Sequence, residues 1–197
     1  MDPMTMACIA SILVVALVTH ELGHVLGARL LGIRVAEVGI GLPPRIGALS
    51  WRGFELSLNW IPLGAFVRYH ERAAPREFSS LGDLPAWQRL VVTLSGPLAN
   101  LGVAAVALAV EMTWLGALTP LSVWILSALA FLSIAIGATN LIPIPPLDGS
   151  KVLFLTIETV RGHRLVSQQV QARVDRAALF VTIVAFAGGL VFGLVGK

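Results

Sequence analysis

Charge is scarce in this sequence. Of its 197 residues only 13% are Asp, Glu, Lys or Arg, whereas 56% are hydrophobic. Because soluble domains are about one quarter charged, this composition excludes an ordinary water-soluble protein and predicts an integral membrane protein in contact with a lipid bilayer. The net charge of +3 is too small to predict binding of nucleic acid. Cysteine is scarcer still: Cys8 stands alone, so an internal disulfide is impossible.

Long apolar runs, by contrast, are plentiful. A helix needs about 20 mostly apolar residues to cross a bilayer, and four stretches meet this length: residues 6–31, 87–110, 120–140 and 177–195, approximately. We therefore expect an α-helical polytopic membrane protein with about four transmembrane helices, folded as one domain over residues 1–197. The first run has no basic leader and no clean cleavage site, so it does not resemble a signal peptide.

The pattern changes between the first two predicted spans. Phe54–Trp60, FELSLNW, alternates apolar and polar residues with a period of two, as a half-buried strand does, and Arg34–Gly41 is another candidate strand. Residues 34–69 are therefore predicted to form a small membrane-associated β-sheet on the cytoplasmic side. Because an open sheet cannot face lipid at depth, we expect it at the membrane interface or in a cavity.

The distribution of basic residues predicts an orientation. The N-terminus and the short connection Glu111–Thr119 contain no Lys or Arg. The two long connections contain nearly all of them: Arg34, Arg45, Arg52, Arg68, Arg72, Arg76, Lys151, Arg161, Arg164, Arg173 and Arg176. The positive-inside rule then predicts a multi-pass protein of the cell inner membrane with both termini outside the cytoplasm.

The first predicted span contains three residues that can carry chemistry. His20 and His24 are four residues apart and share a helix face, so both can bind one metal ion. Glu21 lies beside that face and can reach a water on the metal, which makes HELGH an H-E-x-x-H arrangement of two zinc ligands and a general base. Alternatively the histidines bond to neighbouring helices, but this leaves the costly intramembrane Glu21 unexplained.

A catalytic zinc ion needs a third protein ligand. Asp148 is the only acid in the stretch NLIPIPPLDGS, and we place it at the same membrane depth as the histidines. It is our candidate third ligand for one zinc ion per chain. The alternative is that Asp148 caps the helix that begins near Gly149.

Small residues are placed to support such a site. Gly23 and Gly27 form a small-xxx-small pair that permits close helix approach. The second span contains SGPLAN, where Pro97 should bend the helix. We expect this segment to pack against the histidine helix through Ser95, Gly96, Pro97 and Asn100.

Four segments resemble the site-2 protease family of intramembrane zinc metalloproteases, in its bacterial type. They are HELGH at 20–24, PLGAF at 62–66, SGPLAN at 95–100 and NLIPIPPLDG at 140–149. The resemblance implies that His20, His24 and Asp148 bind zinc, that Glu21 activates water and that Asn140 holds the substrate backbone. Many bacterial members carry a PDZ domain between the second and third spans. Only Glu111–Thr119 lies there in this chain, so no PDZ-mediated partner is expected.

The expected reaction is hydrolysis of a peptide bond in or near a transmembrane segment, as in regulated intramembrane proteolysis. The substrate would be a membrane protein such as an anti-sigma factor or a signal-peptide-like segment. Because a helical substrate must become extended before cleavage, we predict that Gly39, Ile40 and Gly41 present a sheet edge to it. The alternatives are a membrane protein that binds or transports metal, and an inactive family member; the intact Glu21 argues against the second.

Overall fold

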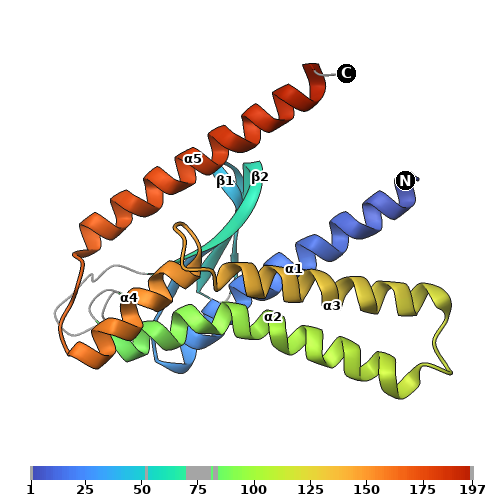
Figure 1. Cartoon of the computed structure of the whole chain (residues 1–197), viewed down its shortest axis with the longest axis horizontal. Coiled ribbons are helices and arrows are strands. Elements are labelled where there is room, and N and C mark those ends of the chain that lie inside the picture. The colour runs from blue at the N-terminus through green and yellow to red at the C-terminus, as the bar shows by residue number, and fades with distance from the viewer. Residues whose placement is uncertain (1, 52, 70–80, 82–83, 196–197) are drawn as a thin grey trace.

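The computed structural model describes all residues except 1, 52, 70–80, 82–83 and 196–197. Its elements in chain order are α1 (Pro3–Leu30), β1 (Val35–Trp51), β2 (Phe54–Tyr69), α2 (Ala86–Trp114), α3 (Pro120–Asn140), α4 (Asp148–Arg161) and α5 (Gln168–Val195). Helices α1, α2 and α3 pack against one another in a bundle, and the sheet projects from it (Figure 1). The predicted combination of helices with a small β-sheet is confirmed.

Three helices in the described part of the chain are long and apolar enough to cross a membrane, namely α1, α2 and α3. They correspond to the predicted spans 6–31, 87–110 and 120–140, although α2 continues one turn further, to Trp114. The fourth predicted span, 177–195, is part of α5, which begins at Gln168. Its crossing of the membrane stays a prediction.

Local capping explains where two of the spans begin. Asp2 accepts a hydrogen bond of 2.9 Å from the Thr5 backbone N–H, and Pro3 fills the first turn of α1. Thr119 caps α3 in the same way through the Ser122 N–H, followed by Pro120. A side-chain oxygen satisfies a free donor at the helix start, and proline there has no N–H to lose.

The strand arrangement corrects one prediction. Residues 37–40 of β1 pair with residues 65–68 of β2 on one side and with residues 55–58 on the other. Asn59 also donates its side-chain N–H groups to the Ile40 and Gly41 carbonyls, both at 3.2 Å. The predicted free edge at Gly39, Ile40 and Gly41 is therefore wrong, because this segment lies inside the sheet.

Residues 65–68 of β2 form one edge of the sheet, and residues 47–51 of β1 form the opposite edge. Residues 65–68 pair with β1 on one side only, within the described part of the sheet.

An apolar cluster attaches the sheet to the bundle; its buried members are Val25, Ala28, Ile33, Val35, Val38, Phe54 and Val92. Arg29 of α1 adds a cation–π contact, with its guanidinium carbon 5.0 Å from the centre of the Phe54 ring. This contact and the apolar cluster hold the sheet next to the C-terminal half of α1.

Helices α1 and α2 approach closely where the small residues were predicted to permit it. A Cβ atom on Gly23 would overlap the Ser95 carbonyl and the Ala99 side chain, and one on Gly27 would overlap the Ser95 hydroxyl. Pro97 and Asn100 of α2 are also fully buried, and both lie against Gly137 of α3. Lipid offers no hydrophobic force to press helices together, so close van der Waals contact between small residues has to hold this pair.

Candidate metal centre

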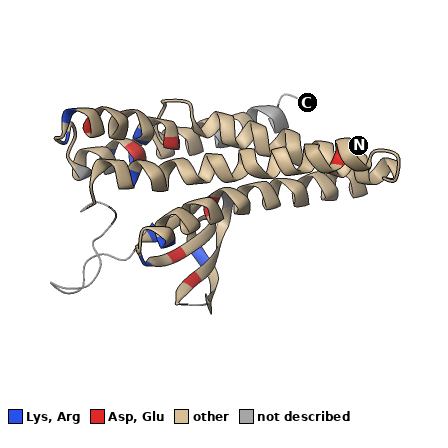
Figure 2. Cartoon of the chain, turned by 90° about the horizontal axis from the view of Figure 1, so that it is seen from below, with Lys and Arg blue, Asp and Glu red and all other residues tan. Residues whose placement is uncertain are grey.

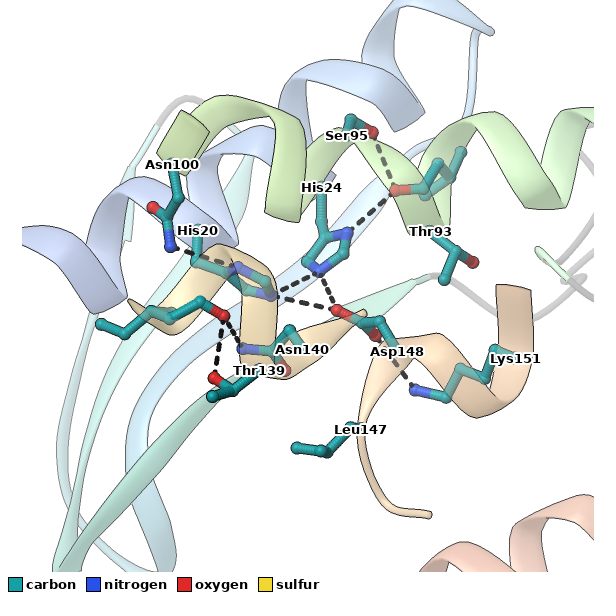
Figure 3. Close-up of polar contacts among 12 residues, drawn as sticks. His20, His24, Thr93, Ser95, Asn100, Thr139, Asn140, Leu147, Asp148 and Lys151 are labelled. Carbon is teal, nitrogen blue, oxygen red and sulfur yellow. Dashed lines mark hydrogen bonds and ion pairs between the residues drawn. The ribbon is translucent and has the colours of Figure 1, made fainter. Parts of the chain in front are cut away.

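The two histidines of α1 point into the protein rather than toward lipid. His20 and His24 are 5% and 8% exposed, and their rings lie edge to face with centroids 4.8 Å apart. Figure 3 shows both rings pointing at the start of α4, with α2 above them in the view. The four-residue spacing therefore places two nitrogen donors on one buried face, as predicted.

Asp148 reaches the same point from the opposite direction. Helix α3 ends at Asn140, the proline-rich segment 141–147 is not helical, and α4 starts at Asp148. The N-cap of α4 is Leu147, with no side-chain cap, so the alternative role of Asp148 as the helix cap is excluded. Its Oδ2 atom lies 3.0 Å from the Nε2 atoms of both His20 and His24.

The donor set fits a metal ion. His20, His24 and Asp148 each offer one ligand atom, and these atoms all lie within 4.8 Å of one another. Burial alone would raise the pKa of Asp148, but the contacts with His20 and His24 outweigh it and hold this pKa well below its usual range. A carboxyl group has to be ionised to bind a metal, and a low pKa agrees with that requirement. Two imidazoles and one carboxylate are a known zinc set that leaves one position open.

Further contacts orient each ligand. The Nδ1–H of His24 donates to the Val92 carbonyl at 2.8 Å, which leaves Nε2 of His24 free for a metal. Lys151 places its ammonium 3.6 Å from the other carboxylate oxygen of Asp148, Oδ1. That contact turns Oδ2 toward the histidines. Asn100 faces the remaining ring nitrogen, Nδ1 of His20, at 3.5 Å.

Glu21 lies beside the converging ligands and is not one of them. It is 8% exposed and lines a cavity of about 340 Å³ together with His20, His24 and Asp148. A carboxylate so placed can exchange a proton with a water molecule in the cavity. Asn140, at the end of α3, lines the same cavity.

The cavity wall also contains residues that the sequence analysis did not assign. Residues 64–67 and Tyr69 of β2 line it, whereas Gly39, Ile40 and Gly41 do not. The segment PLGAF had been noted for its resemblance, yet nothing in its local pattern indicated that it would face the histidines. Of the predicted support residues, Asn100 contacts a ligand ring, and Ser95 and Gly96 pack directly against α1.

The chain is similar to known metalloproteases. The model of peptidase family M50 matches residues 8–120 and 116–185. A Thermotoga maritima protein assigned as a zinc metalloprotease is 41% identical over 93 residues, which are 44% of this chain and 19% of that protein. The chloroplastic membrane metalloprotease ARASP of Arabidopsis thaliana is 31% identical over 111 residues, or 54% of this chain and 25% of the relative.

A solved structure shows the same fold. The site-2 protease from Methanocaldococcus jannaschii aligns with a TM-score of 0.53 and 20% identity, covering 96% of this chain and 68% of that one. The matches with the two curated relatives extend over a quarter of their length or less. This chain therefore spans only a small part of each of these longer proteins.

Gly96 provides a test of the geometry. A Cβ atom there would overlap the His24 ring, whereas one on Gly102 of the same helix meets no atom within 4 Å. We predict that Gly96→Ala displaces His24, at a cost of about 1–3 kcal/mol, and weakens zinc binding by about 5- to 150-fold. Chelator competition on the purified protein measures this, with Gly102→Ala as the matched control. Unchanged affinity in Gly96→Ala would contradict the placement of His24.

Proposed function

Because the chain belongs to peptidase family M50, we propose that it is a zinc-dependent endopeptidase that cleaves membrane proteins in or near a transmembrane segment. One observation carries the proposal. His20, His24 and Asp148 converge within 4.8 Å, next to Glu21, inside a protein whose helices are long enough to cross a membrane. Ionisable groups in membrane helices are costly and are functional by default.

The residues have separate roles in hydrolysis. His20, His24 and Asp148 would hold one zinc ion, which when bound lowers the pKa of a coordinated water and polarises the scissile carbonyl. Glu21 takes a proton from the attacking water and delivers it to the leaving amine nitrogen. The buried position of Glu21 beside the ligands supports this role. Helices α1 and α2 exclude lipid from the ligands on one side.

The substrate must be presented in an extended form. A helical substrate hides its carbonyls in hydrogen bonds, and unwinding in lipid would leave backbone groups unpaired at several kcal/mol each. The free edge at residues 65–68 of β2 borders the cavity and can pair with an added strand. The substrate strand is therefore assigned to the edge at residues 65–68 and not to Gly39–Gly41 of β1, which has no free edge.

Asn140 can assist at the other side of the cavity. Its amide nitrogen donates to the Ile136 carbonyl of its own helix at 2.9 Å, which fixes the side chain (Figure 3). Its carbonyl oxygen can then accept from a substrate N–H. We assign Asn140 to substrate binding on this basis.

The orientation in the membrane follows from charge. The start of α1 and the α2–α3 turn lie at one end of the bundle, whereas the start of α2 and the end of α4 lie at the other. Figure 2 shows Lys and Arg gathered at the second end and on the sheet. The second end therefore faces the cytoplasm of the inner membrane, and cleavage occurs near the cytoplasmic end of a substrate such as an anti-sigma factor.

The general-base role predicts a selective loss. Glu21→Gln removes the proton acceptor and leaves the three ligands, so cleavage of a reconstituted substrate should fall by about 10²–10⁴-fold while zinc content stays at one per chain. Glu111→Gln is the control, because Glu111 contacts Ser127 far from the cavity. Near-normal cleavage by Glu21→Gln would remove the base role. If the protein only binds or transports metal, neither the unmodified protein nor Glu21→Gln would cleave the substrate.

The role of Asn140 predicts a defect in substrate binding alone. Asn140→Ala should bind zinc normally and cleave about tenfold more slowly, since one hydrogen bond to the substrate is lost. Thr139→Ala is the matched control, because among the described residues the neighbouring Thr139 hydroxyl bonds to carbonyls of its own helix. Equal rates for the two variants would exclude Asn140 from the substrate site.

The proposed orientation can be measured by cysteine labelling in a Cys8→Ser background. A membrane-impermeant maleimide should label Thr119→Cys in intact cells. It should label Ser167→Cys only after the membrane is opened. The opposite pattern would invert the topology and place the cut at the outer end of the substrate.

A further inference from the structure

A histidine that binds metal through Nε2 carries its proton on Nδ1. That N–H is buried here and needs an acceptor, which also fixes the ring and makes the ligand more basic. His24 has such an acceptor in the Val92 carbonyl, 2.8 Å away. The Nδ1–H group of His20 needs an acceptor of the same kind.

Asn100 is the polar group at that position (Figure 3). Its amide nitrogen Nδ2 lies 3.5 Å from Nδ1 of His20, and its carbonyl oxygen Oδ1 has no hydrogen-bond partner in the described structure. In this orientation two donors would face each other whenever His20 holds a metal. A rotation of the amide by 180° exchanges oxygen and nitrogen with almost no change in shape. It breaks no other hydrogen bond of Asn100 among the described residues.

Packing on both sides holds Asn100 in place. It is fully buried on α2, one turn after Pro97. A Cβ atom on Gly137 of α3 would lie 3.4 Å from the Cβ of Asn100. The side chain is thus fixed between α3 and the histidine helix, with its amide directed at one ring nitrogen.

We propose that Asn100 is a positioning residue whose side-chain carbonyl accepts the Nδ1 proton of His20, so that Nε2 of His20 is unprotonated and faces the metal. The competing role is a purely structural one, in which a buried amide only helps to join helices. The inference depends on the metal site and not on peptide hydrolysis, so it can fail while the protease assignment stands.

The two roles predict different behaviour of two variants. Asn100→Asp keeps an oxygen acceptor at the same place, whereas Asn100→Leu keeps a similar volume and has none. Chelator competition with the full-length protein in detergent measures Zn²⁺ affinity, and the visible absorption of the Co²⁺ form reports ligand geometry. We expect Asn100→Asp to bind within about threefold of the unmodified protein and Asn100→Leu about 10- to 100-fold more weakly, with a weakened Co²⁺ spectrum.

Ser133→Ala is the control, because Ser133 is a second fully buried polar residue and has no partner in the described structure. It should leave metal affinity unchanged. If Asn100→Leu does not fold, Asn100→Ala takes its place in the comparison. Full affinity in the Leu or Ala variant, or an equal loss in the Asp variant, would overturn the proposal. Normal zinc affinity in the Asp variant, with a loss in the Leu or Ala variant, would support the proposal. A purely structural amide would not require an oxygen acceptor at this position.

Discussion

The close approach of α1 and α2 is the contact on which the metal centre depends. Gly23 and Gly27 allow the α2 backbone to lie against α1, and Gly96 leaves room for the His24 ring. The pair encloses polar side chains that lipid could not solvate. A larger residue at any of these places would separate the helices and expose the ligands. The glycines of this interface thus carry a functional constraint as well as a packing one.

The second constraint is the return of the chain after α3. Asn140 ends that helix, the prolines of residues 141–147 prevent its continuation, and α4 begins with Asp148 next to the histidines. The ion pair of 2.5 Å between Arg89 of α2 and Glu158 of α4 ties the far end of α4 to the bundle. The third ligand is therefore held at both ends of its helix.

The sheet forms one wall of the cavity at the metal centre, and its edge there has backbone groups without a strand partner. Its inner segment, residues 37–40, is paired on both sides, and residues 65–68 are paired on one. An open edge beside a buried metal site is unusual, because exposed edges invite pairing with other chains. In the proposed cleavage of a helical substrate, such pairing would stabilise the extended form.

The sequence by itself determined whatever depends on neighbours along the chain. Composition determined that this is a membrane protein. The caps at Asp2 and Thr119 set helix starts, and four-residue spacing placed His20 and His24 on one face. The tertiary structure decided what depends on residues far apart in the sequence. It brought Asp148 to the histidines, made residues 65–68 of β2 rather than Gly39–Gly41 of β1 the open edge at the cavity, and placed Asn100 beside His20. The small residues indicated that α1 and α2 would meet. They could not give the strand register or the partner of each buried polar atom, because packing between distant segments decides those.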